Sequence, residues 1–355
     1  MIRILDLYIG KTILTTSALT LSVLLALSAM FRFIDQMRSI GRGYYDMVHA
    51  ALFTLYSVPG DVVMFFPMAA LIGGLIGLGI LASSSELVVM QAAGLSRLNI
   101  INSVMKSAVL MVLVMMAVAE WGAPVTDRAA RELRIKAISD GNVFAARQGV
   151  WAKDGDSFVN IKEVDDLGNL KEVIIYQFQP DLALARVVRA EAAQYLDDAW
   201  RLQQVTELTF SDERIEQQLL PTQRWRSTLT PDKLSVVSIK PEMLSLRGLR
   251  EYVDYLQQNG QEASRYQLAY WRKILQPVTL AAMLLLALSF IFGPLRSVTM
   301  AARVLLGILT GFGFYMSNEV FGPLALVYQL PPLAGAALPS LLFIGISLYF
   351  MRRKI

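Results

Sequence analysis

The chain has no cysteine among its 355 residues, and His49 is its only histidine. Disulfides, zinc–thiolate sites and thiol nucleophiles are therefore excluded, as is any metal site with two histidine ligands. No G-x-x-x-x-G-K-[ST] run is present, so the chain does not bind a nucleotide in the P-loop manner. No block of basic residues suggests nucleic acid. We expect a protein that is not an enzyme and holds no cofactor of its own.

Charge is also scarce, at 17% of residues against about 25% in ordinary soluble domains. The deficit is confined to six nearly charge-free segments, at 12–31, 50–82, 99–121, 274–293, 301–326 and 333–351. A bilayer core needs roughly 20 apolar residues of helix. We therefore predict six membrane helices, the first of them uncleaved because its apolar run is longer than that of a signal peptide.

Residues 127–272 have the composition of a soluble domain. From about 148 to 240 apolar and polar residues alternate, and turn signals such as Asp154-Gly155 separate the runs. In one run, Trp200, Leu202, Gln204, Thr206, Leu208 and Phe210 are predicted to share a face. This pattern predicts an antiparallel sandwich or jelly roll, followed by a helix over 245–258.

The predicted fold is thus a membrane α-helical bundle with an inserted all-β domain. Residues 1–126 form three membrane helices, 127–265 the β domain with a short helix, and 266–355 three more membrane helices. Basic residues near span ends favour the cytoplasm. Their distribution places both termini there and the β domain in the periplasm. The basic residues on the side of the termini are Arg3, Lys11, Arg97, Arg296, Arg303, Arg352, Arg353 and Lys354. Arg32, Arg38 and Arg42 in the first loop count against this orientation.

A short helix is predicted over residues 83–94, between the second and third spans. Ser83 and Glu86 fit a capping box, and Gly94 fits the residue that ends a helix. Glu86 has two interpretations: it only caps the helix, or it contacts a partner protein at the cytoplasmic rim. In the second case Leu87, Val88, Met90 and Gln91 form the remaining contact face.

Arginines gather at the outer ends of the first and third spans, namely Arg32, Arg38, Arg128, Arg131 and Arg134. They either extend toward lipid phosphates at the membrane surface or form a ring that binds the phosphates of an anionic lipid. The run Gly73-Gly74-Leu75-Ile76-Gly77-Leu78-Gly79 lets helices approach closely. Packing within the chain is the simplest explanation of this run.

These residues resemble the LptF/LptG family of lipopolysaccharide export permeases. The resemblance is carried by segments in the family's order along nearly the whole chain, at 8–12, 65–70, 85–94, 229–234, 265–268 and 288–298. It implies a heterodimer with a sister permease (LptF), two copies of a cytoplasmic ATPase (LptB) that binds ATP, a bitopic partner (LptC) and a bridge (LptA) toward the outer membrane. It places the protein in a bacterial inner membrane among membrane lipids, with lipopolysaccharide as its substrate.

The resemblance also assigns roles to residues. Glu86 matches the acid of the family's coupling helix, and Arg32 and Arg134 match basic positions near the lipid phosphates. Ser39 occupies a position that is basic in other members. For the wall of an apolar cavity we expect the first, second and fifth spans, with Phe65, Phe66, Leu305 and Phe312 facing it.

Other functions remain open at this point. A secondary transporter usually carries charged or broken-helix sites near the bilayer midplane, and we expect none in these spans. A membrane scaffold that displays a β domain has little use for a capped helix at the cytoplasmic rim. A membrane hydrolase lacks any triad or metal constellation to support it.

Overall fold

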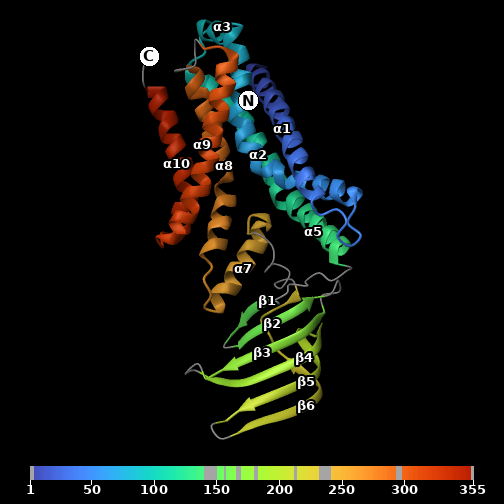
Figure 1. Ribbon diagram of the computed structural model, residues 1–355. Helices are drawn as coiled ribbons and strands as arrows, with labels where there is room; N and C mark the ends of the chain where they lie inside the picture. Colours follow the sequence, from blue (N-terminus) through green and yellow to red (C-terminus); the bar gives the residue numbers. More distant parts are fainter. Residues whose placement is uncertain are drawn as a thin grey trace.

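A computed structural model describes residues 4–139, 150–155, 157–164, 169–179, 183–211, 214–231, 241–292 and 298–352 (Figure 1). Some predicted features lie outside these residues, namely Arg3, Arg296, Arg353, Lys354, and parts of the segments 229–234 and 288–298. The described helices are α1 (Ile4–Met37), α2 (Met47–Ser83), α3 (Glu86–Ala92), α4 (Arg97–Ala117), α5 (Ala123–Ser139), α7 (Leu246–Gln258), α8 (Ser264–Phe292), α9 (Met300–Val327) and α10 (Pro332–Arg352).

Six helices of the described chain are long and apolar enough to cross a membrane, as predicted. The third is not a single regular helix. A π-helical turn, η1 (Val118–Gly122), joins α4 to α5, and the helical path continues to Ser139, beyond the domain boundary predicted at residue 126. The amino-terminal end of α1, the carboxyl-terminal end of α10, and α3 all lie at the end of the bundle opposite the β domain (Figure 1).

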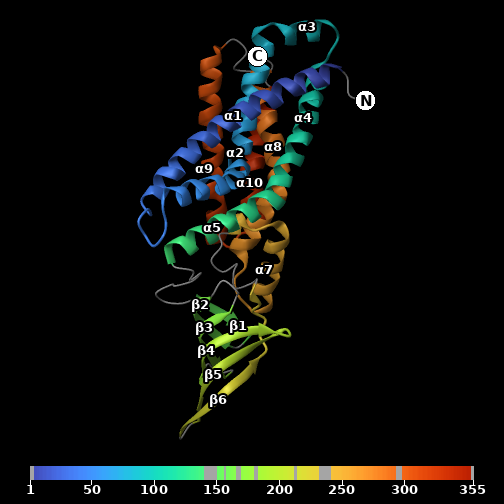
Figure 2. The ribbon, with the colours of Figure 1, turned by 90° about the vertical axis from the view of Figure 1, so that its right-hand side faces the viewer.

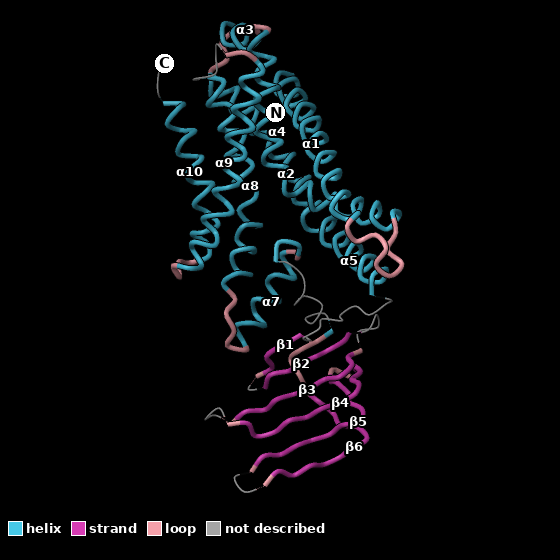
Figure 3. The backbone as a smooth tube through the Cα atoms, in the orientation of Figure 1, coloured by secondary structure: helices cyan, strands magenta, loops and turns pink. Residues whose placement is uncertain are grey.

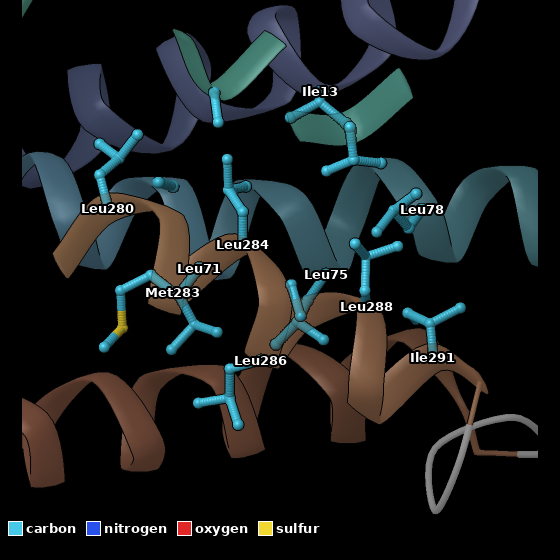
Figure 4. Close-up of a cluster of buried hydrophobic side chains, with 14 of the residues drawn as sticks. Ile13, Leu71, Leu75, Leu78, Leu280, Met283, Leu284, Leu286, Leu288 and Ile291 are labelled. Atoms are coloured by element: carbon cyan, nitrogen blue, oxygen red, sulfur yellow. The ribbon is translucent and has the colours of Figure 1, made fainter. Parts of the chain in front are cut away.

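Helix α2 lies at the centre of the bundle and contacts α1, α5, α8 and α9. Its buried leucines interdigitate with the apolar side chains of α8, in a cluster whose labelled members are Ile13, Leu71, Leu75, Leu78, Leu280, Met283, Leu284, Leu286, Leu288 and Ile291 (Figure 4). Lipid tails are as apolar as these side chains, so close packing rather than burial from water holds the helices together.

Glycines set the spacing of α2 from its two neighbours. A Cβ added at Gly73 would lie 2.6 Å from the backbone nitrogen of Ser17 in α1, and one at Gly77 would lie 2.7 Å from Thr16 Oγ1. Thr16 also donates a hydrogen bond of 2.7 Å to the Gly73 carbonyl. The glycine run therefore lets α1 pack closely against α2, which agrees with the prediction that this run serves packing within the chain.

A second glycine pair, which the sequence analysis did not single out, packs α9 against α2. A Cβ at Gly307 would lie 2.8 Å from Leu75 Cδ1, and one at Gly311 would lie 2.9 Å from Met68 Cγ. The spacing of four residues is the same small-xxx-small pattern.

The inserted domain contains β1 (Val150–Asp154), β2 (Ser157–Val164), β3 (Leu170–Phe178), β4 (Leu184–Leu196), β5 (Ala199–Phe210) and β6 (Ile215–Trp225). These strands form one antiparallel sheet in chain order. The inserted antiparallel β domain is confirmed, but the described strands follow a meander and lack the non-sequential strand order of a jelly roll. Helix α7 contributes Tyr252, Tyr255 and Leu256 to the domain's core, and it lies between the sheet and α8 (Figures 1 and 2).

The predicted face of β5 is wrong beyond its middle. Trp200 and Leu202 are buried, but Val205 and Glu207 are buried after them instead of Gln204, Thr206 and Leu208. Gln204 has a φ of 51°, and this left-handed residue shifts the alternation by one position. Glu207, now on the inner face, pairs with Arg186 and accepts a hydrogen bond of 3.1 Å from Gln223.

Candidate functional site

Helix α3 connects α2 to α4 at the end of the bundle far from the β domain (Figure 3). The predicted capping box is wrong. Ser83 is the last residue of α2 and donates its hydroxyl to the Ile80 carbonyl, and the amino-terminal cap of α3 is Ser85, with a φ of 60°. Because α2 continues to Ser83, Glu86 becomes the first residue of α3, and its carboxylate accepts a hydrogen bond of 2.9 Å from Ser84.

The predicted end of α3 at Gly94 is confirmed. The amide of Gly94 donates to the Gln91 carbonyl at 3.0 Å, and the amide of Leu95 donates to the Met90 carbonyl at 3.1 Å. Gly94 has a φ of 93°, which glycine adopts without a steric penalty. This paired arrangement is a Schellman motif, and it fixes where α3 stops and α4 begins.

The contact residues predicted on α3 do not share one surface. Leu87 and Met90 are only 4% and 8% exposed, because they belong to the hydrophobic core cluster of the helical bundle, which also contains Ile9 and Ile100. These two side chains therefore anchor α3 to the bundle, and contact of either with a partner protein stays a prediction. Val88 and Val89 are 54% and 65% exposed.

The exposed side of α3 is completed by Gln91, and the half-buried Glu86 lies at its start. Glu86 also faces the Tyr8 hydroxyl at the beginning of α1. The outward surface of α3 is thus one acid, one amide and two valines, on a helix whose other side is fixed. A partner that fits it needs an apolar groove with a donor for the carboxylate.

At the other end of α1, Arg32 is not a free cation. Its Nη2 contacts Oδ1 of Asp61 in α2, and the second Asp61 oxygen accepts a hydrogen bond of 2.8 Å from Ser28. The Asp61 side chain is 6% exposed and that of Arg32 is 32% exposed. Asp61 is not among the predicted site residues, although a carboxylate inside an apolar span is itself a signal of function.

The remaining predicted arginines have different surroundings. Arg38 is highly exposed and lies 4.0 Å from Asp35. Arg131 contacts Met243, beside the start of α7. Arg134 donates a hydrogen bond of 3.3 Å to Ser39 and lies 5.6 Å from the centre of the Phe53 ring.

Arg134 also faces Tyr45, whose pKa is raised by burial although the arginine's charge opposes the shift. The structure thus brings Arg134 together with the first loop, at Ser39 and Tyr45. It places Arg32 in a separate contact with α2.

Further charged side chains are buried inside the spans, contrary to expectation. Asp127 of α5 faces Arg131, Arg32, Asp61 and Lys273. Lys273 of α8 donates a hydrogen bond of 3.2 Å to the Ala119 carbonyl in η1, where the π-helical turn displaces the regular bonding. Helices α1, α2, α5 and α8 therefore contribute three cations and two acids to one cluster of charges near the β domain.

A smaller polar cluster joins α1 to α4 near α3. Asp6 accepts a hydrogen bond of 2.5 Å from Lys106 and another from Ser103. The described residues hold no group of three or more histidine, aspartate or glutamate side chains arranged to bind a metal ion. The buried charges instead act as links between helices.

The predicted cavity residues lie on the expected helices but differ in exposure. Leu305 and Phe312 of α9 are 58% and 55% exposed, whereas Phe65 is half-buried and Phe66 is buried in the bundle core. Phe66 thus packs in the bundle core, and its contact with an apolar cavity stays a prediction. In the most apolar 18-residue stretch of each helix, 11% of the residues of α1 and 22% of the residues of α9 are buried, against 61% of those of α2.

These two helices flank α2 and leave open apolar faces, which include Leu19, Val23, Leu27 and Phe31 on α1 and Leu305, Ile308, Leu309 and Phe312 on α9. Such faces are stable against lipid tails, against a second subunit, or around an apolar ligand.

Known proteins are similar to this chain over nearly its whole length. The family model for the lipopolysaccharide export system permease LptF/LptG matches residues 7–353. The LptG permease of Escherichia coli strain K12 is 49% identical over 357 residues, which cover 99% of this chain and 98% of that protein. The LptG permease of Haemophilus influenzae is 47% identical over 356 residues, or 100% of this chain and 99% of that protein.

The LptF permease of Escherichia coli strain K12 is 30% identical over 125 residues, which cover 35% of this chain and 34% of that protein. The resemblance found in the sequence therefore extends over the whole length, including α3, the β domain and all six candidate spans. The chain belongs to the LptF/LptG family of lipopolysaccharide export system permeases.

Proposed function

We propose that the chain is the permease subunit of an ATP-driven exporter that extracts lipopolysaccharide from the outer leaflet of the inner membrane. It pairs with the sister permease LptF, receives energy from two copies of the ATPase LptB, and works with LptC and the LptA bridge. Both termini and α3 face the cytoplasm, and the β domain lies in the periplasm. The observation that supports the proposal is α3, a short helix fixed by the buried Leu87 and Met90, with Val88 and Val89 exposed on its other side.

The open apolar faces of α1 and α9 supply the substrate route. Transfer of an acyl chain out of lipid costs about 0.8 kcal/mol for each CH₂ that meets water. A lipid with several chains would cost on the order of tens of kcal/mol by the same rule, so its path must stay apolar throughout. We place the lipid tails between the α1 and α9 faces of this chain and those of LptF, with Leu305 and Phe312 in contact.

The arginines near the β domain bind the phosphorylated head group in this scheme. Arg134 and Arg38 belong to or border the first loop, and Arg32 and Arg131 lie deeper between helices. A guanidinium binds phosphate through paired N–H groups, which suits arginine better than lysine. Closure of the ATPase dimer then pushes α3, narrows the apolar space and moves the lipid toward the β domain.

Affinity purification from mild detergent tests the proposal. A stoichiometric P-loop ATPase and a second permease should accompany the chain, and lipopolysaccharide should crosslink to probes beside Arg32 and Arg134. Glutamate at both arginines should weaken that crosslinking, whereas Arg214→Glu, an exposed change beside β6, should not. Unchanged crosslinking in the double variant would mean that the two arginines do not bind the head group and only extend toward lipid phosphates at the membrane surface.

The buried charges favour one second candidate, a secondary transporter driven by an ion gradient. Asp61, Asp127 and Lys273 are the kind of intramembrane groups that such proteins use. A purified preparation free of any ATPase that still moves substrate along a proton or sodium gradient would support this candidate and reject the exporter.

A further inference from the structure

Arg32 is held by an ion pair that leaves part of its guanidinium unsatisfied. Nη2 contacts Asp61, but the Nε–H is buried and has no hydrogen-bond partner within the described part of the chain. Arginine binds an anion most strongly when Nε and Nη2 engage two oxygens side by side. Here Asp61 uses one oxygen for Arg32 and the other for Ser28, so it occupies only half of that edge.

The two partners also differ in access. About a third of the Arg32 side chain is exposed, whereas Asp61 is almost fully covered. Asp127 of α5 faces Arg32 as well, but Arg131 and Lys273 are nearby to balance its charge. Arg32 is therefore the partner of this pair that an anion can reach.

We propose that Asp61 is an internal competitor for Arg32, which releases the guanidinium to a lipid phosphate during loading and takes it back during ejection. The inference rests on the proposed function, in which Arg32 binds a head-group phosphate. A phosphate offers two oxygens to Nε and Nη2 and carries more negative charge than a carboxylate, so it satisfies the donor that Asp61 leaves unused.

The return step follows from the same contacts. While phosphate occupies Arg32, Asp61 is a buried carboxylate that keeps only the Ser28 hydroxyl, and such a group is costly to leave unpaired. When the apolar space narrows, the Arg32–Asp61 pair forms again. This lowers the free-energy cost of releasing the phosphate. Asp61 thus weakens binding and accelerates release, because differences in affinity between related complexes arise mostly in the dissociation rate.

The assembled transporter, purified with its partner subunits, provides the test. Asp61→Asn keeps the size of the side chain and an acceptor for Ser28 but removes the competing charge. We expect more lipopolysaccharide retained per complex and ATP-driven release that is roughly ten-fold slower, the effect of losing about one charged hydrogen bond. Ser28→Ala alters no charge but frees the second Asp61 oxygen for Arg32 and makes an unpaired Asp61 more costly, so it should lower the retained lipopolysaccharide and speed its release.

Glu251→Gln is the matched control, since Glu251 is an exposed acid beside the exposed Arg247 on α7. It should change neither quantity. A fall of retained lipid and of release together in Asp61→Asn and Ser28→Ala would show that the pair only positions Arg32 or holds the helices. If Asp61→Asn does not assemble, the direction of the Ser28→Ala change decides.

Two failures are distinguishable. Wild-type complex that retains no lipopolysaccharide would reject the proposed function. Wild-type complex that retains it, with Asp61→Asn at the wild-type values, would reject only the competitor role of Asp61.

Discussion

Arg303, near the start of α9, donates a hydrogen bond of 3.0 Å from Nη1 to the Gly79 carbonyl in α2. Arg303 is 4% exposed, and a Cβ at position 79 would lie 2.9 Å from its Nη1, so a larger residue there would crowd the contact. Gly79 lies in the last turns of α2, directly before α3. This contact links the end of α2 that precedes α3 to α9, a helix with an open apolar face, and we expect it to carry a displacement of α3 to α9.

The first prediction concerns this link. Arg303→Met keeps most of the side-chain volume but removes the donor to Gly79. We expect ATP hydrolysis by the assembled complex to continue while lipid release per ATP falls roughly ten-fold, since a charged hydrogen bond is lost. The ratio of released lipid to hydrolysed ATP in proteoliposomes measures this. Arg352→Met, at the exposed end of α10, is the control, and an unchanged ratio in Arg303→Met would exclude the link.

Glu86 supplies the second prediction. Glu86→Lys reverses the charge at the start of α3, where a carboxylate also favours the helix through its dipole. The variant should insert in the membrane at the wild-type level but lose the co-purified ATPase or its coupled transport. Glu251→Lys on the exposed side of α7 should retain both. Normal coupled transport by Glu86→Lys would remove α3 from the mechanism.

The third prediction tests the spacing of α1 and α2. Gly73→Ala places a methyl group against the Ser17 backbone, and overpacking of this kind costs about 1–3 kcal/mol. The melting temperature of the purified protein should therefore fall. Gly313→Ala in α9 has open space around its Cβ and should be neutral or slightly stabilising, because alanine favours helix. Equal melting temperatures for the two variants would contradict the close packing at Gly73.

Orientation is the fourth prediction, and the cysteine-free chain makes it simple to measure. Cysteine at Leu219, which is 73% exposed on β6, should react with a membrane-impermeant maleimide in spheroplasts. Cysteine at Val89, 65% exposed on α3, should react only after the membrane is opened. The reverse pattern would place the β domain in the cytoplasm.

The fifth prediction concerns α7 on the sheet. Burial raises the pKa of Tyr255 from 10.0 to about 12, and its hydroxyl donates a hydrogen bond of 2.7 Å to the Lys153 carbonyl. Because the folded pKa is the higher one, the neutral phenol stabilises the fold fully below about pH 10, and that stability is lost as the pH rises toward 12. Thermal melting across this range should show the loss, and Tyr255→Phe should reduce it. A variant with the wild-type pH dependence would mean that Tyr255 is accessible to water.

Much of the fold could be predicted from local patterns. Apolar length defined the six spans, and Gly94 marked the end of α3, because both depend on neighbouring residues alone. Which residues of β5 face the core could not be predicted, because nothing in the sequence indicates that Gln204 adopts a left-handed conformation. The capping box was wrong because three serines in a row offered several caps, and α2 continues to Ser83, which leaves Ser85 as the cap of α3.

The candidate site was only partly predictable. The sequence places Glu86 and the arginines near span ends, but it does not show that Arg32 is paired with Asp61, which is distant in the chain. Leu87 and Met90 have the periodicity of a contact face, and periodicity cannot tell whether the chain itself or a partner covers it. Contacts between helices decide both questions.

The most direct measurement of the central claim is lipid release from proteoliposomes that contain this chain with its permease partner and the ATPase. The account predicts that lipopolysaccharide leaves the membrane only when ATP is hydrolysed, and that the permease pair without the ATPase releases none. Release at the full rate by the permease pair alone, or with ATP hydrolysis blocked, would contradict it.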